Sequence, residues 1–527
     1  MEQISDLKKI IDYGVSNEAV MYNWHLLKNK CEEGVIIRTH VDGEPKTIKK
    51  EKRFTDEEIN IIEEAYNFCE ESHRGKTRKS GEPYYTHPLL ATLYQLHIFP
   101  ITDATSVAAC LLHDVVEDSE KRGETLAKIE SKFGDKIKTV VDGLTNIRGP
   151  VTEEPESFAK LLFSMIADYR VILIKLCDRL HNLYTLDGHN KPDKQIEIAT
   201  ETLEFFVPIA QRLGVWALKN ELEELAFKHK DAKIFEQIKK EHIEQLKIDE
   251  NYCNELQSGI KNILSTNNIE CAFVIEHKTL YHIYSIMQEK NVEQKSIENY
   301  FSVVVVLQSN DVLECWRALG AILGHYPRAE QMIYDYINFP KFNQFRSLRT
   351  VVFDGQGRKV EVLIRTSEME ETAKNGIIKG LYEKEEYKTL DLTDEELSIL
   401  KRWVDEMIKE RGTDALGAIW DLMKINYYQK EIYAFANSKK YRLPEGATAL
   451  DLALIAYKNQ AFYLGKTIVN GKDVHYSVLL NDKDNVSFVF SNQPTINKNW
   501  INSVGMFKPI ANIYHYLTES FPYYETL

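Results

Sequence analysis

The feature that most constrains this chain is an apolar run that ends in a cluster of ionisable residues. The run covers residues 107–112 and is followed by His113, Asp114, Glu117 and Asp118. Its side chains are apolar nearly all the way round a helix, which predicts a buried helix. At 100° per residue, His113 lies one turn before Glu117, and Asp114 lies one turn before Asp118. Because buried charges are costly unless they are paired or bind a metal, this helix predicts a cation site.

The residue types in this cluster indicate what the cation site could do. An imidazole beside a carboxylate offers mixed nitrogen and oxygen ligands, and the two carboxylates one turn later could orient a water molecule. A His-Asp pair alone says little, because chance produces one in many chains of this length. The Glu-Asp pair at helical spacing makes the metal-site interpretation more specific.

A second apolar segment carries further polar residues. We predict one long helix over residues 158–186, on which three polar residues fall at i, i+4 and i+7 and share a face: Asp178, Asn182 and Thr185. An aspartate after so apolar a segment needs a partner. The proposed metal could supply it, and a salt bridge to Lys175 or Arg179 is the alternative.

A glycine-punctuated loop at residues 73–81 contains four basic residues and leads into His87 and Pro88. It is either a solvated surface turn or an anion-binding loop, and its basic charge in an acidic protein favours the second interpretation. Taken alone, His87 would more often begin a helix than bind a metal.

The bulk properties exclude several classes of protein. The length of 527 residues predicts about three to four domains. No apolar stretch approaches the roughly 18 residues that span a bilayer, and the start lacks a secretory signal pattern. Seven scattered cysteines without a Cys-x-x-Cys pair indicate a reducing compartment and no zinc ribbon, and the net charge of −14 argues against broad nucleic-acid binding. We therefore expect a soluble cytoplasmic protein without a membrane segment.

Beyond residue 270 the pattern changes to mixed helix and strand. A β-branched run at 301–307 predicts a buried strand, and residues 349–364 predict a β-hairpin around Asp354-Gly355-Gln356-Gly357. A helix is predicted at 394–410, followed by a small β-rich unit at 431–491.

These motifs together resemble the HD-domain metallophosphohydrolases and, more closely, the long RelA/SpoT homologues that make and degrade the alarmone (p)ppGpp. The resemblance covers residues 55–515. It is carried by Arg78-Lys79-Ser80-Gly81-Glu82-Pro83-Tyr84, His87-Pro88, His113-Asp114-Val115-Val116-Glu117-Asp118 and Lys175-Leu176-Cys177-Asp178-Arg179-Leu180-His181-Asn182.

The resemblance implies a role for each site residue. It implies that Mn²⁺ is held by His87, His113, Asp114 and Asp178. Glu117 and Asp118 would activate the attacking water, and Arg78 would stack on the guanine base. The nucleotide pocket would also be lined by Lys79, Ser80, Asn182 and Thr185. Hydrolysis of a 3′-pyrophosphate needs these elements: a Lewis acid, a carboxylate near the water, and cations for a polyanionic substrate. One departure is Lys76, where the family usually has glutamine.

The middle of the chain resembles the family's synthetase domain, but with altered residues. Thr279 and Tyr281 stand at positions that are basic in the family. Asn299 aligns with the metal-binding aspartate of the family. Further replacements are Val304 for arginine, Phe345 for tyrosine, Arg349 for histidine and Leu363 for glutamine. Glu361 remains, but pyrophosphoryl transfer needs a metal-binding carboxylate pair and cations on the phosphates. We therefore expect a degenerate synthetase that acts as a scaffold or regulator.

The C-terminal β-rich part resembles a TGS domain, a small β-grasp module, in which the family's tRNA-contacting histidine is Tyr457. The expected fold is thus multidomain: an all-α HD-type hydrolase domain, an α+β nucleotidyltransferase-like domain and the β-grasp module. The predicted boundaries are 1–50 for an extension of unknown function, 51–200 for the HD domain, 201–245 for a helical connector, 246–385 for the synthetase-like domain, 386–428 for a helical linker, 429–492 for TGS and 493–527 for a helical tail.

Several functions compete at this point. The leading interpretation is a Mn²⁺-dependent (p)ppGpp 3′-pyrophosphohydrolase without synthetase activity, whose TGS or synthetase-like domain could contact a regulatory partner. The alternatives are a bifunctional synthetase/hydrolase, a non-catalytic alarmone-sensing protein, and an HD hydrolase for a related nucleotide such as NADPH. The complete set of metal and water-activating residues argues against the sensor, and the basic loop favours a guanine nucleotide.

Overall fold

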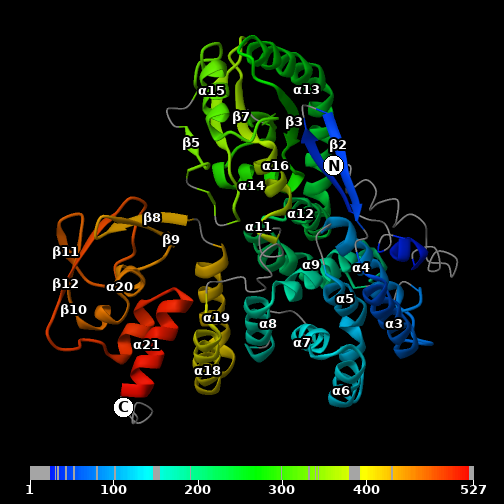
Figure 1. The fold of residues 1–527 in the computed structure, drawn as a ribbon, viewed down its shortest axis with the longest axis vertical. Coiled ribbons are helices and arrows are strands. Elements are labelled where there is room, and N and C mark those ends of the chain that lie inside the picture. The colour runs from blue at the N-terminus through cyan, green and yellow to red at the C-terminus, as the bar shows by residue number, and fades with distance from the viewer. Residues whose placement is uncertain are drawn as a thin grey trace. The chain divides into compact units, whose positions relative to one another are not determined.

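Figure 1 shows the computed structural model of the chain, coloured from blue at the N-terminus to red at the C-terminus. It describes residues 24–29, 31, 35–41, 44–51, 54–78, 81–99, 103–145, 155–189, 191–297, 300–329, 333–338, 340–341, 343–378, 392–428 and 431–520. The chain divides into two units, one formed by Met1–Val141 and Leu173–Glu386 and the other by Asp142–Ile172 and Tyr387–Leu527.

Within the described residues, the first unit begins with a helical segment at 24–29. A two-stranded antiparallel sheet, β1 (Val35–Val41) and β2 (Glu44–Glu51), comes next and is followed by helices. The helices are α3 (Asp56–Ser72), α4 (Thr86–Ile98), α5 (Ala104–Glu117), α6 (Arg122–Phe133) and α7 (Asp135–Leu144). Helix α5 packs against α3 and α4, and all of its residues except Thr105 and Glu117 are buried. This confirms the predicted buried helix and the all-α character of the HD part.

The prediction of one continuous helix over residues 158–186 was wrong. The structure has two helices instead, α8 (Pro155–Ala167) and α9 (Tyr169–Tyr184), which are separated at Asp168. The carboxylate of Asp168 accepts the backbone N–H of Arg170 at 2.9 Å and pairs with the Arg170 guanidinium at 2.6 Å. Because that carboxylate satisfies donors at the start of α9, it favours a new helix start at this point.

Five consecutive helical segments follow: α10 (Pro192–Glu201), a π-helical turn (Thr202–Phe206), α11 (Val207–Leu213), α12 (Trp216–Lys230) and α13 (Ala232–Thr266). Gly214 ends α11 with a φ of +78°, and the backbone of Gly376 packs directly against it. A Cβ atom on Gly376 would lie 1.9 Å from the carbonyl oxygen of Leu213, so only glycine permits this approach. The end of the α/β domain is thereby held against α11.

The α/β domain contains one mixed sheet with strand order β3-β4-β7-β6-β5. Its strands are β3 (Cys271–His277), β4 (Phe301–Leu307), β5 (Tyr334–Asp335), β6 (Leu348–Phe353) and β7 (Lys359–Thr366), and its helices are α14 (Leu280–Lys290), α15 (Val312–Leu323) and α16 (Ser367–Asn375). Strands β4 and β7 are parallel, whereas β6 and β7 form the predicted hairpin.

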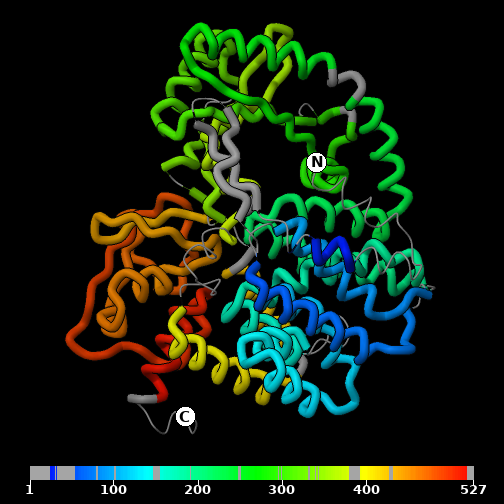
Figure 2. Tube along the Cα trace, turned by 45° about the vertical axis from the view of Figure 1, so that its right-hand side comes forward, coloured from blue at the N-terminus to red at the C-terminus, as the bar shows by residue number. Residues whose placement is uncertain are grey.

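The core of this domain lies between the sheet and two helices. Side chains of β4 such as Val303 and Val305 cluster with Ile260 and Leu264 of α13 and with Ile322 of α15. Helices α13 and α15 contact each other, and Figure 1 shows both helices beside the strands of the sheet, while Figure 2 shows the Cα trace from a second direction. The fully buried β4 confirms the strand predicted at 301–307.

In the second unit, α8 packs against α18 (Asp394–Arg411) and α19 (Ala415–Met423), and Phe158 lies 5.7 Å from Trp420 between ring centres. A five-stranded sheet has the order β11-β10-β12-β8-β9, with β12 and β8 parallel. Its strands are β8 (Glu431–Ala436), β9 (Lys439–Pro444), β10 (Leu464–Val469), β11 (Lys472–Val474) and β12 (Asn485–Phe490), accompanied by α20 (Ala449–Tyr457) and α21 (Phe507–Ser520). This is the strand order of a β-grasp sheet, and the TGS assignment stays a prediction.

Candidate metal centre and nucleotide site

Helix α5 presents the predicted cluster at its C-terminal end. Asp103 begins the helix by accepting the N–H of Ser106, and Asp118 is its last, capping residue. The Nδ1 atom of His113 lies 2.7 Å from the carbonyl oxygen of Cys110. Because a carbonyl only accepts, Nδ1 carries the proton, and Nε2 of the neutral ring is left as a metal ligand.

Four predicted ligands from three helices converge beside this imidazole. His87 comes from the first turn of α4, Asp178 comes from α9, and His113 and Asp114 come from α5. The Nε2 atom of His87 lies 3.0 Å from Asp178 Oδ1 and 3.5 Å from Asp114 Oδ2. The Nε2 atom of His113 lies 3.1 Å from Asp114 Oδ1 and 3.9 Å from Asp178 Oδ1. The ligand atoms of His87, His113 and Asp178 all lie within 4.8 Å of one another.

The chemistry of this group fits a divalent cation. Burial opposes protonation of His113, but Asp114 and Asp178 outweigh it and raise the pKa of His113 to about 9. Burial would likewise raise the pKa of Asp178, yet Lys175 and His87 hold it well below its usual range. The two carboxylates therefore stay ionised in a buried place, where they need positive charge. A divalent cation would meet that need and release the imidazole proton.

Lys175 connects this group to Glu117. Its Nζ atom lies 3.3 Å from Asp178 Oδ2 and 3.9 Å from Glu117 Oε1, so the salt bridge considered as an alternative partner for Asp178 is also present. Burial raises the pKa of Glu117, and Lys175 only partly offsets this. The buried Oε1 atom of Glu117 has no hydrogen-bond donor among the described residues. A carboxylate whose pKa is raised is a better proton acceptor than an ordinary carboxylate.

Asp118 lies in a more open environment than Glu117. Lys76 Nζ lies 3.3 Å from both its Oδ2 atom and its backbone oxygen. The buried His73 points its Nε2 atom toward the same carboxylate at 3.6 Å, while its Nδ1 atom bonds the carbonyl oxygen of Cys69. The lysine that departs from the family pattern therefore contacts a proposed catalytic residue.

The basic loop reaches the same site through Arg78. Its guanidinium donates to Asn182 Oδ1 at 3.0 Å and to Thr185 Oγ1 at 3.4 Å. Asn182 in turn donates to Asp178 Oδ1 at 2.7 Å. The structure thus joins three of the predicted nucleotide-binding residues to each other and to a proposed metal ligand. The other two, Lys79 and Ser80, lie outside the described residues.

Sequence reasoning missed His181. Its Nδ1 atom lies 2.8 Å from His87 Nδ1 and 3.0 Å from an Arg78 nitrogen. Burial, followed by His87 and Arg78, holds the pKa of His181 well below its usual range, so this ring is neutral and accepts from both. His87 consequently carries its proton on Nδ1 and turns Nε2 toward the carboxylates. The signal was present, because His181 follows Asp178 by three residues on one helical face.

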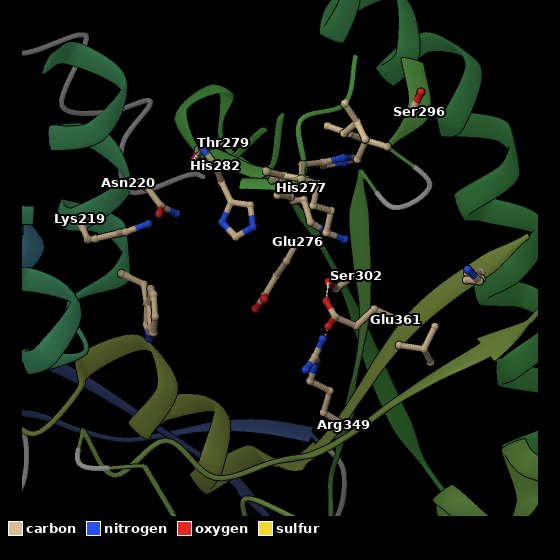
Figure 3. Close-up of a pocket in the computed structure, with 18 residues that line it drawn as sticks. Lys219, Asn220, Glu276, His277, Thr279, His282, Ser296, Ser302, Arg349 and Glu361 are labelled. Atoms are coloured by element: carbon tan, nitrogen blue, oxygen red, sulfur yellow. Dashed lines mark hydrogen bonds and ion pairs between the residues drawn. The ribbon is translucent and has the colours of Figure 1, made fainter. Parts of the chain in front are cut away.

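The synthetase-like domain contains a separate pocket, shown in Figure 3. There Glu361 forms an ion pair with Arg349 and accepts a hydrogen bond from Ser302. Thr279 is the N-cap of α14, and Tyr281 packs against Phe227 at 5.6 Å between ring centres. Asn299, which aligned with the family's metal-binding aspartate, lies outside the described residues.

Comparisons with known proteins agree with this description. A model of the HD domain matches residues 65–216, and a model of the region found in RelA / SpoT proteins matches residues 276–388. The guanosine-3′,5′-bis(diphosphate) 3′-pyrophosphohydrolase of Haemophilus influenzae is 32% identical over 85% of this chain and 66% of that protein. The bifunctional (p)ppGpp synthase/hydrolase SpoT of Escherichia coli is 31% identical over 87% and 65%, and the GTP pyrophosphokinase of Myxococcus xanthus is 29% identical over 85% and 59%.

The helical fold and the matched model make the first part of the chain an HD domain. Together with the second model and the relatives, this shows that the chain belongs to the RelA/SpoT family. The chain spans about three fifths to two thirds of the length of these relatives. Within the described residues, every helix is too short or too polar to cross a membrane.

Proposed function

We propose that this chain is a Mn²⁺-dependent hydrolase that removes the 3′-pyrophosphate of (p)ppGpp, giving GDP or GTP and pyrophosphate in stringent-response alarmone turnover. The observation that carries the proposal is the convergence of His87, His113, Asp114 and Asp178 beside the half-buried Glu117. Two imidazole nitrogens and two carboxylate oxygens suit a transition metal better than Mg²⁺, which prefers oxygen ligands and water.

Each residue has a proposed role. A bound divalent cation would supply Lewis acidity and lower the pKa of water. Glu117 would accept the proton of the attacking water, because its pKa is raised by burial and it lies beside the ligands. Asp118, held by Lys76, would help to orient that water. Arg78 would exchange its contacts with Asn182 and Thr185 for the nucleotide and stack on the base.

The proposal includes the loss of synthetase activity. Glu361 is the carboxylate that matches the family's synthetase motif, and it is already paired with Arg349. The positions of Thr279 and Tyr281 offer a hydroxyl and an aromatic ring instead of cations for ATP phosphates. The relatives include a bifunctional enzyme and a pyrophosphokinase, so bifunctionality is the alternative that must be tested.

The domain boundaries predicted from sequence, the TGS assignment and a cytoplasmic location belong to the same proposal. None of the seven cysteines, all of which lie among the described residues, forms a disulfide, which supports a reducing compartment. A regulatory partner would contact the β-grasp or synthetase-like part of the chain.

The direct test is incubation of the purified chain with ppGpp and Mn²⁺, Mg²⁺ or EDTA. We expect GDP and pyrophosphate with Mn²⁺, less with Mg²⁺ and none with EDTA. Orthophosphate as the product, or full activity in EDTA, would contradict the proposed reaction.

A further inference from the structure

Lys76 departs from the family pattern, which has glutamine at this position, and its backbone is firmly placed. The N–H of Lys76 donates to the carbonyl oxygen of His73 at 3.0 Å, and its own carbonyl oxygen accepts the N–H of Tyr84 at 3.0 Å. Gly75, with a φ of +79°, makes the turn between these contacts. The lysine side chain therefore extends from a fixed turn between α3 and α4 to the C-terminal end of α5.

The ammonium group of Lys76 contacts two oxygens of one residue. Its Nζ atom lies 3.3 Å from Oδ2 of Asp118 and 3.3 Å from the backbone oxygen of Asp118. Because Asp118 is the capping residue of α5, that backbone oxygen lies at the negative end of the helix dipole, where a cation is stabilising. Lys76 thus holds both the helix end and the carboxylate. A glutamine amide could donate hydrogen bonds here but would bring no charge.

A buried imidazole approaches the same carboxylate oxygen. The Nε2 atom of His73 lies 3.6 Å from Oδ2 of Asp118 and has no hydrogen-bond partner among the described residues. Its Nδ1 atom lies 2.9 Å from the carbonyl oxygen of Cys69, so Nδ1 carries the proton. Burial lowers the pKa of His73 and outweighs the carbonyl of Cys69 and the charges of Asp114 and Asp118. The ring is therefore neutral, and the lone pair of Nε2 needs a donor.

The donor that fits this place is Lys76. Its ammonium has three N–H groups on a flexible stem, so it can donate to both oxygens of Asp118 and, after a small movement, to Nε2 of His73. The other carboxylate oxygen of Asp118, Oδ1, accepts no hydrogen bond from the part of the chain that the structure describes. We propose that Lys76, seated by His73, is a positioning residue that holds Oδ2 of Asp118 and leaves Oδ1 for the attacking water. This role rests on the proposed hydrolase function.

A split between kcat and KM distinguishes a positioning lysine from a lysine that binds the substrate. In Lys76→Met we expect kcat for ppGpp with Mn²⁺ to fall about tenfold while KM stays within about twofold, because the lost charge-assisted hydrogen bonds act on Asp118. Lys76→Arg should restore most of kcat. A rise of KM at unchanged kcat would place Lys76 on the substrate and overturn the proposal.

The matched control is Lys132→Met. The side chain of Lys132 is 43% exposed, against 44% for Lys76, and it likewise pairs with a carboxylate, that of Glu64 at 3.8 Å. It lies on α6, away from the proposed ligands, so kcat and KM should stay at their wild-type values. His73→Asn, which keeps a donor for the Cys69 carbonyl but lacks the Nε2 acceptor, should lower kcat without raising KM.

A double-mutant cycle shows whether Lys76 acts through Asp118. In the Asp118→Asn background, Lys76→Met should change kcat by less than about twofold. The same four proteins are melted in EDTA, where neither metal nor turnover contributes. There Lys76→Met should lower Tm by about 1–2 °C in the wild-type background and by less in Asp118→Asn. Equal effects of Lys76→Met in both backgrounds would overturn the proposal. A wild-type chain that does not hydrolyse ppGpp would instead contradict the proposed function, and the melting cycle would still decide whether Lys76 holds Asp118.

Discussion

At the scale of single residues, the proposed metal ligands are oriented by partners that fix their tautomers. The carbonyl of Cys110 holds Nδ1 of His113, and the neutral ring of His181 accepts from Nδ1 of His87. In both rings Nε2 is therefore directed at the carboxylates of Asp114 and Asp178. Such outer contacts set both the orientation and the basicity of metal-bound histidines.

Asp114→Ala should abolish hydrolysis and metal binding together. The carboxylate contacts both histidines, so its loss removes a ligand and leaves His113 without its nearest charge partner. The expected results are no detectable GDP, a lower Mn²⁺ content, and no rise of the melting temperature on adding Mn²⁺. Full activity in this variant would contradict the site.

Glu117→Gln should separate chemistry from metal binding. The amide keeps the shape of the side chain but cannot accept a proton, so kcat should fall by a factor of about 10²–10⁴. Metal content, measured by elemental analysis, should stay at the wild-type value. A parallel loss of metal would show that Glu117 is a ligand.

Arg78→Lys should act on substrate binding. Arginine contacts His181, Asn182 and Thr185 at once, and a lysine cannot reproduce that planar set of donors or its stacking on a base. We expect KM for ppGpp to rise about tenfold while Mn²⁺ affinity is retained. An unchanged KM would mean that the loop is only a surface turn.

At the scale of elements, the carboxylate of Glu224 in α12 contacts the N-terminal end of α14. Glu224 of α12 accepts the N–H of Leu280 at 2.5 Å, while Thr279 caps the same end of α14 by accepting the N–H of His282. Desolvation raises the pKa of Glu224 to about 7, and its backbone hydrogen bonds only partly oppose this. The folded state therefore favours the protonated side chain.

This junction predicts a pH dependence of stability. The contribution of Glu224 is fully present below its unfolded pKa of about 4.5 and is lost as the pH rises through about 7. Glu224→Gln should remove that slope, so its melting temperature relative to wild type should rise between pH 5 and pH 8. Thr279→Ala, which removes about 1 kcal/mol of capping, should lower stability at every pH without removing the slope that Glu224 produces. A Glu224→Gln profile parallel to that of wild type would contradict the assignment.

At the scale of the whole molecule, one chain combines the four proposed metal ligands with a synthetase-like domain whose motif residues are altered. Within that domain the motif carboxylate Glu361 is paired with Arg349, and Thr279 and Tyr281 are used for capping and packing. These uses stabilise the fold and leave no described cation at either position for ATP. These structural uses support the proposal that the domain lacks synthetase activity.

The whole-chain prediction is that no ppGpp forms from ATP and GDP or GTP. The assay should use the Asp114→Ala variant, because an active hydrolase could erase the product of a slow synthetase. Labelled ATP with Mg²⁺ and thin-layer chromatography would detect transfer. ATP-dependent accumulation of ppGpp would show that the chain is bifunctional.

The sequence by itself determined the elements and the ligand types. The apolar run before His113 and the polar face of Asp178, Asn182 and Thr185 follow from helical periodicity, which is a local property. The strand at 301–307 and the hairpin at 349–364 follow from β-branched runs and a glycine turn. The break at Asp168 was missed because apolar periodicity continues through it, and the TGS assignment stays a prediction.

Only the tertiary structure decided which side chains meet. Packing brings His181 to His87, from which it accepts a hydrogen bond, and places Lys175 between Asp178 and Glu117. Packing also pairs Arg349 with Glu361. No periodicity encodes such contacts, because each depends on how two helices or strands are placed against each other. The shifts in pKa also depend on the tertiary structure, because desolvation and neighbouring charges arise only once the chain has folded.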